Sequence, residues 1–451
     1  MDEFLPRITA ISQHTRAEQS EKAAERVFTP GNIALSVTLY LAALIALIAL
    51  NRAFSQSLLT PSGAPHYVYQ AEAFLHGQWN IALPASKVDV IQLHGLDYIV
   101  YPPFPALVFL PVVAFMGLNT PDPLLTILIS ALNLPLLYLL FEQARATGLT
   151  RRTLRENMIF ALLLYFGSIN LWLSLGGRMW FEAHIIGFTC STLSLLLSLR
   201  GRHGWAAFAL GCAFFSRSTV AVFFPVTLYF AWQGVSGERH IEAFLASLWR
   251  RAPHWQDIPW RRLAPPLVVI CCVILLFAWR NWFLFGSPLD SGYSALLAQH
   301  YPEVTQGPFN IQYVPSNIIG NFFTFPNIHF NGPFDRHPTF DMLNGGVSVS
   351  PFVTTPLFLY LFWRNRAFNA TRAVLWICIG LLVVALLLFH AIGWYEFGVR
   401  YLYDGYPWAF LLLVLTDARL DWRVWALGAF ALIVNILGAA QFWHGGVLHF
   451  P

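Results

Sequence analysis

Charged residues are scarce in this chain of 451 residues. Asp, Glu, Lys and Arg make up 11% of the sequence, whereas hydrophobic residues make up 57% of it. Soluble domains carry about a quarter charged residues, so the composition excludes an ordinary soluble protein. The mean hydropathy of +0.55 indicates a membrane protein instead.

Cysteine is also rare, and its positions exclude two kinds of site. All five cysteines lie within apolar runs, and no pair has the CxxC or Cys/His spacing of a redox or zinc site. We expect them to be small core residues. The stretch 1–26 is polar and charged and lacks the apolar core of a secretory signal peptide. We therefore expect residues 1–32 to form a cytoplasmic tail.

Several catalytic and binding motifs are missing. The sequence contains no P-loop, no GxGxxG on a βαβ unit, no GxSxG elbow and no HExxH. Nucleotide-binding folds, serine hydrolases and zinc proteases of the usual kinds therefore find no support. No internal repeat is visible either, although many secondary transporters contain one.

Apolar runs of about 20 residues, the length that crosses a bilayer, recur along the chain. We expect an all-α polytopic membrane protein with about 11 transmembrane helices (about 10–13) in one membrane domain, residues 33–451. The helices are predicted near residues 33–54, 123–143, 156–175, 183–199, 205–216, 219–232, 266–285, 350–363, 374–390, 406–415 and 424–442.

The basic residues favour one orientation. If the N-terminus is cytoplasmic and the short, proline-rich segment 103–117 is re-entrant, 20 of the 27 Lys and Arg residues lie on the inner side, as the positive-inside rule requires. A crossing at 103–117 would turn the basic loops 145–155 and 239–262 outward. We therefore predict a re-entrant segment, a location in the plasma (inner) membrane, and an outer side that faces the periplasm or exterior.

This topology places two long polar loops, residues 55–122 and 286–349, on the outer side. They and the other outer segments hold 11 of the 23 acidic residues and ten of the 14 histidines. These are groups that can do acid–base chemistry. The inner side, with its excess of arginine, has the character of a surface that contacts anionic lipid.

The first outer loop has a helical pattern followed by an aromatic segment. Tyr67, Ala71 and Phe74 recur at helical spacing and Gly77 ends the run, which predicts a short amphipathic helix on the bilayer surface. The segment 89–105 that follows is rich in aromatic residues and carries two acids. Alternatively, this segment only lies at headgroup level, where Tyr and Trp are favoured.

Three arginines lie at outer helix ends. Arg178 stands in the loop 176–184 with an acid and a histidine, and Arg217 interrupts an apolar stretch. An arginine in such a place needs a partner, often a phosphate or a carboxylate. Arg217 could instead reach water at the tip of a helical hairpin. Arg400 is the best candidate for binding an anionic headgroup, with a structural pair to Glu396 or Asp404 as the alternative.

The outer histidines are candidate metal ligands together with nearby carboxylates. No pair of them has a diagnostic spacing. The sequence therefore identifies no cofactor and leaves a divalent metal open.

Six segments carry a family resemblance when they are taken together. Between residues 33 and 442 the chain contains, in order, HYVYQAEAFLHG, HGLDYIVYPPFPALVFLP, SINLWLSLGGRMWFEAH, GCAFFSRSTVAVFFP, GSPLDSGY and EFGVRYLYDGYPWAFLL. With this order and spacing the chain resembles the GT-C superfamily of membrane glycosyltransferases, of the protein-mannosyltransferase and aminoarabinose-transferase type (glycosyltransferase family 39-like).

The resemblance implies a GT-C fold and a mechanism. Such enzymes take a sugar from a polyprenyl-phosphate donor at the outer membrane face and transfer it to a lipid, glycan or protein acceptor. An acid in the first outer loop deprotonates the acceptor hydroxyl, and cations stabilise the leaving lipid phosphate. Arg400, Arg217 and Arg178 match motifs on the correct side for that phosphate.

One residue that the family uses near its catalytic base is absent. The family usually has an Asp about four residues before the tyrosine that matches Tyr67, and here that position is Gly63. The base would then be Asp97 or Asp89, followed by Glu72, whose alternative is a solvated helix face. The matched motifs further imply substrate-binding roles for a set of residues: His66, Tyr67, Glu182, His184, Asp290, Tyr293, Glu396 and Tyr401.

A non-catalytic protein is the alternative function. A GT-C-like transporter or assembly scaffold could keep the fold without the base. The glycine at position 63, where the family usually has an Asp, favours this alternative. The outer arginines favour the enzyme, because an inert scaffold has little use for cations at helix ends. We expect membrane lipid as a partner in either case, and no nucleic acid.

Overall fold

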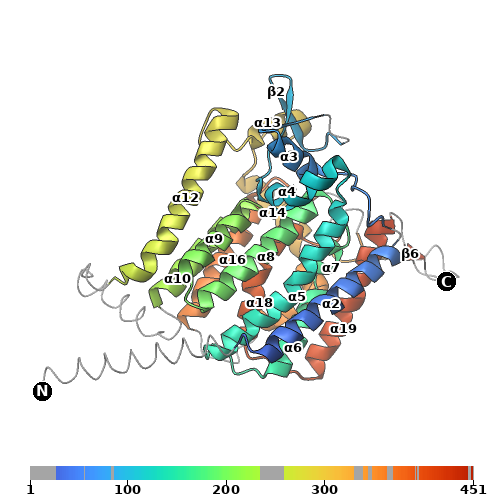
Figure 1. Ribbon diagram of the computed structural model, residues 1–451. Coiled ribbons are helices and arrows are strands. Elements are labelled where there is room, and N and C mark those ends of the chain that lie inside the picture. The colour runs from blue at the N-terminus through green and yellow to red at the C-terminus, as the bar shows by residue number, and fades with distance from the viewer. Residues whose placement is uncertain are drawn as a thin grey trace, which may run out of the picture.

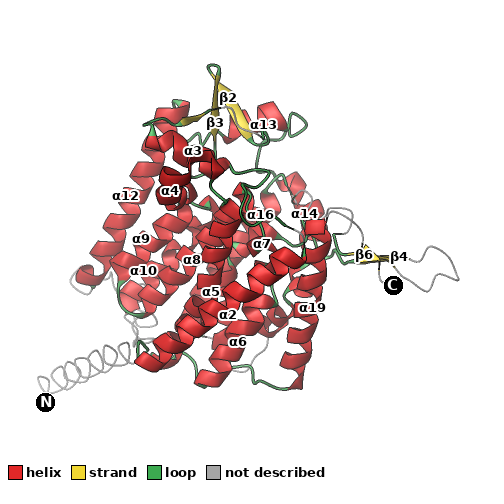
Figure 2. Cartoon of the chain, turned by 45° about the vertical axis from the view of Figure 1, so that its right-hand side comes forward, coloured by secondary structure: helices red, strands yellow, loops and turns green. Residues whose placement is uncertain are grey.

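The computed structural model describes residues 27–54, 56–82, 86–233, 258–329, 339–343, 348–362, 369–391, 393, 396–444 and 448–449. Most of the predicted N-terminal tail and the basic stretch 239–251 lie outside the described residues. The described part of the chain is mainly a bundle of helices (Figures 1 and 2).

Six described helices are long and apolar enough to cross a membrane, so the chain is a multi-pass membrane protein. They are α2 (Pro30–Ala53), α5 (Asp122–Ala146), α8 (Met179–Leu199), α12 (Trp260–Phe285), α16 (Ala370–Leu388) and α19 (Trp422–His444). All six agree with predicted spans to within a few residues, apart from an earlier start to α12. The total of about 11 is not confirmed.

The other predicted spans are shorter or interrupted. The run predicted at 156–175 divides into α6 (Leu154–Phe166) and α7 (Asn170–Ser174). The interruption includes Gly167, where an added Cβ would lie 3.0 Å from the Cβ of Ala431 on α19. The remaining short helices in the bundle are α9 (His203–Phe214), η2 (Ser218–Phe223, a 3-10 helix), α10 (Phe224–Gln233), α17 (Arg400–Tyr403) and α18 (Tyr406–Leu415).

The helix predicted at 350–363 is wrong as a single span. The structure has a short α15 (Pro351–Thr354) followed by a 3-10 helix, η6 (Pro356–Phe362). Pro356 has no N–H and disfavours helical geometry at the residue before it. Thr355 accordingly leaves the helix, with φ −140° and ψ 64°.

The segment 55–122, predicted as the first outer loop and called so below, folds into a compact unit at one end of the bundle (Figure 1). It contains α3 (His66–Leu75), a three-stranded antiparallel sheet in the order β1-β3-β2 (Asn80–Ile81, Leu96–Ile99, Val90–Leu93), α4 (Phe104–Met116) and the 3-10 turn η1 (Gly117–Asn119). The predicted helix is confirmed as α3, and Gly77 follows its end with φ +68°. Tyr67 and Val68 of α3 pack with Ala106 and Phe109 of α4.

The second outer loop contributes α13 (Tyr293–His300), the 3-10 turn η4 (Ile311–Tyr313) and α14 (Val314–Phe322). A second small sheet joins β4 (Asn327–His329), β5 (Thr339–Asp341) and β6 (Leu448–His449), all antiparallel. Helix α13 lies against β2 through hydrogen bonds between Gln299 and Gln92. The two outer loops therefore contact each other.

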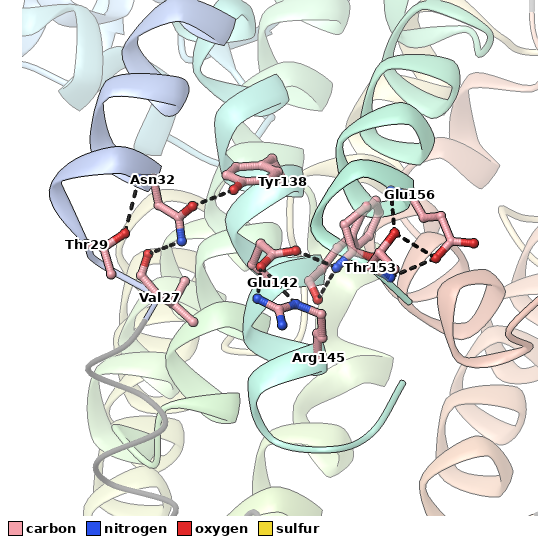
Figure 3. A network of polar contacts seen from close by, with 10 residues as sticks. Val27, Thr29, Asn32, Tyr138, Glu142, Arg145, Thr153 and Glu156 are labelled. Carbon is pink, nitrogen blue, oxygen red and sulfur yellow. Dashed lines mark hydrogen bonds and ion pairs between the residues drawn. The ribbon is translucent and has the colours of Figure 1, made fainter. Parts of the chain in front are cut away.

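A polar network holds α2, α5 and α6 together at the opposite end of the bundle (Figure 3). The buried Glu142 carboxylate accepts hydrogen bonds from Arg145 at 2.6 Å and from Asn157 at 2.7 Å. Tyr138 donates to Asn32 at 2.8 Å. Thr153 and Glu156 form a capping box at the start of α6, the arrangement that satisfies the first free N–H groups of a helix.

Candidate active site

Asp89, an acid of the first outer loop, accepts hydrogen bonds from three side chains. It directly precedes β2 with φ +58°, and it is buried. Its Oδ2 accepts hydrogen bonds of 2.8 Å from the Tyr101 hydroxyl and the Trp180 indole N–H, and its Oδ1 accepts one of 2.8 Å from the Tyr301 hydroxyl. Three separate segments thus fix the orientation of this carboxylate.

Asp89 and its three donors, Tyr101, Trp180 and Tyr301, are called the Asp89 group below. Aromatic residues of the second outer loop and of the segment after α16 lie next to it. Tyr293 forms a hydrogen bond of 3.0 Å with His390, and the Tyr301 and His390 ring centroids lie 6.2 Å apart. Burial raises the pKa of Tyr101 well above its usual value, with the Asp89 charge adding to the effect. Tyr101 therefore remains a hydrogen-bond donor at neutral pH. Burial also lowers the pKa of His390.

Arg217 belongs to a buried ion-pair network. Its Nε donates to both oxygens of Asp404, at 3.2 and 3.1 Å. His184 Nδ1 lies 2.8 Å from the same carboxylate, and Thr219 donates to it as well. The partner of Arg217 within the protein is therefore a carboxylate, that of Asp404. Asp404 had been predicted as one of two possible partners of Arg400.

Arg400 pairs with Glu396, as the structural alternative predicted. Arg400 Nε lies 2.7 Å from Glu396 Oε2, and both side chains are almost fully buried. Ser348 donates a hydrogen bond to the other oxygen of Glu396. Burial raises the pKa of Glu396 to about 7, although Arg400 and Ser348 oppose this shift.

Tyr401 connects the two arginines. The guanidinium carbon of Arg217 lies 5.5 Å from the centre of the Tyr401 ring, and that of Arg400 lies 5.1 Å from it. The Tyr401 ring packs on Phe389, with 5.6 Å between the ring centroids. The Phe389 ring lies next to that of His390, which is also a neighbour of Tyr301, the donor to Asp89. Asp89, Arg217 and Arg400 therefore share a set of neighbours.

His66 and Tyr67 support the Asp89 group from α3. His66 Nε2 lies 2.9 Å from the carbonyl of Val88, directly before Asp89, and its ring faces Trp180 at 6.4 Å between centroids. Burial lowers the pKa of His66. Tyr67 is buried in the packing between α3 and α4.

Three other predicted residues make only local contacts. Asp97 lies on β3, half-buried, with Gln92 as its partner in the sheet. The Glu72 side chain is 30% exposed and lies 3.9 Å from His76, which fits the solvated-face alternative. Asp290 accepts a hydrogen bond from the Gly292 N–H within a tight turn.

Arg178 and Glu182 lie at the start of α8 and face a different set of residues. The Arg178 guanidinium lies 5.3 Å from the centre of a Trp443 ring, and its backbone N–H donates to Glu182 at 3.1 Å. Glu182 interacts with the carboxyl of Asp122. That carboxyl in turn accepts two hydrogen bonds from Ser62.

Several site residues were not predicted from the sequence. They are Tyr101, Trp180, Tyr301 and His390 around Asp89, and Arg280, which donates hydrogen bonds to the carbonyls of Val100 and Tyr101. Arg280 stands near the end of an apolar run. An arginine in such a place needs a polar partner, so the sequence contained a signal for this residue. Among the described residues, no group of three His, Cys, Asp or Glu side chains could hold a metal ion.

The fold is similar to the crystal structure of the Archaeoglobus fulgidus oligosaccharyltransferase in the apo form, with 12% sequence identity and a TM-score of 0.45. The similarity covers 91% of this chain and 56% of that one, so this chain spans little more than half the length of that protein. No family model and no curated protein matches the sequence. Function is therefore argued from the residues of this chain.

Proposed function

We propose that this protein is a membrane glycosyltransferase that uses a polyprenyl-phosphate-linked sugar as donor at the outer membrane face. The observation that carries the proposal is a continuous set of aromatic neighbours between Asp89 and the two arginines. Tyr301 donates to Asp89 and lies next to His390, and Phe389, next to His390, packs on Tyr401, the ring that both Arg217 and Arg400 contact. A carboxylate and two guanidinium groups that share aromatic neighbours offer a base for the acceptor and positive charge for an anionic leaving group.

Asp89 is the proposed base. A carboxylate has about four acceptor sites, and three are occupied by Tyr101, Trp180 and Tyr301. The fourth site, on Oδ1, has no hydrogen-bond donor among the described residues and accepts the proton of the acceptor hydroxyl. The hydroxyl oxygen then forms a bond to the anomeric carbon, and the bond from that carbon to the phosphate oxygen breaks.

Arg217 and Arg400 stabilise the lipid phosphate that leaves. The side-chain hydrogen bonds that Arg217 makes within the described residues both come from Nε, so its terminal nitrogens remain available for a phosphate. Asp404 fixes the orientation of the guanidinium through the hydrogen bonds from Nε. Arg178 remains a predicted phosphate ligand, but its guanidinium lies against Trp443 and not against Tyr401.

The test uses the purified full chain in liposomes with polyprenyl-phosphate-linked hexoses, pentoses and aminosugars, and measures the release of polyprenyl phosphate. We expect release from at least one donor, and a loss of about 100-fold or more in Arg217→Ala, since one charge-stabilising group contributes about that much. Arg202→Ala, an exposed arginine outside the site, is the matched control. Donor binding without release would favour the non-catalytic alternative. The absence of both donor binding and release would contradict the proposal.

A further inference from the structure

Helix α14 buries its two asparagines and exposes both of its isoleucines, with the small Ser316 exposed as well. Asn317 and Asn321 are 1% and 4% exposed, whereas Ile319 is 61% exposed. A helix on a water-facing surface has the reverse pattern, because apolar side chains are driven out of water. The pattern of α14 is that of a helix with hydrocarbon on its outer side.

The apolar surface extends along the chain in both directions from α14. Phe309 and Ile311 before the helix are 59% and 72% exposed, and Phe323 and Phe325 after it are 65% and 57% exposed. The sequence contains no Asp, Glu, Lys or Arg from residue 304 to residue 334. No ionised side chain therefore holds this stretch in water.

The segment is attached to the end of a membrane-spanning helix. Asn317 donates hydrogen bonds to the carbonyls of Leu387 and Phe389, at 2.9 and 2.6 Å, and Asn310 N–H donates to the carbonyl of Leu388 at 2.8 Å. The last carbonyls of a helix have no partner within it, and in hydrocarbon they need another. The buried asparagine supplies one at the C-terminus of α16.

Helix α14 lies next to α16, and the exposed residues of α16 indicate the environment of both helices. The two helices pack against each other and lie side by side in Figure 2. Helix α16 exposes Ile377 and Leu381, 61% and 50% respectively, as a spanning helix does toward lipid. Helix α14 thus packs against a candidate membrane-spanning helix whose exposed residues are apolar as well.

We propose that the segment 309–325 is embedded in the outer leaflet, with Ile319 and Phe323 in contact with lipid acyl chains. Interfacial helices of this kind bury their apolar side to a depth of about 5–10 Å. The partner is therefore bilayer lipid. This proposal is independent of the glycosyltransferase activity.

The test is site-directed spin labelling of the full chain in phosphatidylcholine liposomes, after its five cysteines are replaced by serine. Labels are placed by Ile319→Cys and Phe323→Cys. Leu381→Cys on α16 is the lipid control, and Leu96→Cys, an exposed leucine of the outer sheet, is the water control. We expect the labels at 319 and 323 to match 381, with high collision rates with oxygen and low rates with a water-soluble nickel chelate.

Two results would overturn the proposal. Nickel collision rates at 319 and 323 equal to that at 96 would place the segment in water. Shielding from both reagents would place another protein surface on α14. If the cysteine-free chain does not fold, a photo-crosslinking residue at 319 or 96 in the native-cysteine chain gives the same comparison: crosslinks to lipid at 319 support the proposal, and their absence contradicts it.

Discussion

Tyr301 donates a hydrogen bond of 2.8 Å to Asp89, although the two residues are 212 positions apart in the sequence. This contact joins the second outer loop to the first at the carboxylate that we propose as the base. A proton acceptor must be held within hydrogen-bond reach of its substrate. The contact therefore makes the orientation of the base depend on both loops.

Asp89→Asn tests the choice of base. The amide keeps the shape of the side chain but cannot take a proton, so we expect the transfer rate to fall by about 10²–10⁴-fold, the usual contribution of a general base. Donor binding should change little. The matched variant Asp97→Asn should keep nearly full activity. The reverse order of effects, measured as release of polyprenyl phosphate, would move the base to β3.

Tyr301→Phe tests the role of the second loop. It removes one of the three donors to Asp89, and a hydrogen bond to a charged group contributes about 1.5–3 kcal/mol. We expect kcat to fall by about 10-fold or more with the KM for the donor nearly unchanged. Tyr313→Phe, whose hydroxyl donates to the Gly307 carbonyl, is the control. A larger effect on KM than on kcat would show that Tyr301 binds donor instead.

The pH dependence of donor binding tests the Arg400–Glu396 pair. Because burial raises the pKa of Glu396 to about 7, the carboxyl is mostly neutral below that pH and becomes charged as the pH rises through it. The charged carboxylate competes with the donor phosphate for Arg400. Affinity for a polyprenyl-phosphate-linked sugar, a phosphodiester that keeps one charge throughout, should therefore fall by about five-fold or more between pH 6 and 8.

Glu396→Gln is the control for that prediction. The neutral amide cannot gain charge, so its binding curve should be flat over the same range. The same fall in both proteins would assign the pH dependence to another group.

Arg145→Ala tests the polar network at the other end of the bundle. It leaves the buried Glu142 carboxylate without its cation, and an unsatisfied buried group costs about 1–3 kcal/mol. We expect a lower thermal transition in detergent and no change in transfer kinetics. Arg151→Ala, an exposed neighbour, should change stability by less than about 0.5 kcal/mol. Equal effects of the two variants would show that the network contributes little.

The sequence predicts the helices better than the site. Long apolar runs specify spans such as α5 and α8, because the length of a spanning helix follows from the thickness of the bilayer. Pro356 also carried a local signal for the break at 350–362, since proline interrupts helices. The pairing of Arg217 with Asp404 joins residues 187 positions apart. No local periodicity records such a contact.

The candidate bases show the same limit. Asp89, Asp97 and Glu72 all lie in one outer loop, and their spacing does not distinguish them. They differ in the donors that reach each one, and those donors come from α8 and from the second outer loop. Only the folded arrangement separates the buried Asp89 from the half-buried Asp97 on the sheet.

The most direct measurement is a cryo-EM structure of the full chain with polyprenyl phosphate bound. The account predicts the phosphate within about 3 Å of the terminal nitrogens of Arg217 or Arg400, on the side that faces Tyr401 and the Asp89 group. A phosphate bound elsewhere, against Arg178 or at the end of the bundle that holds Glu142, would contradict it.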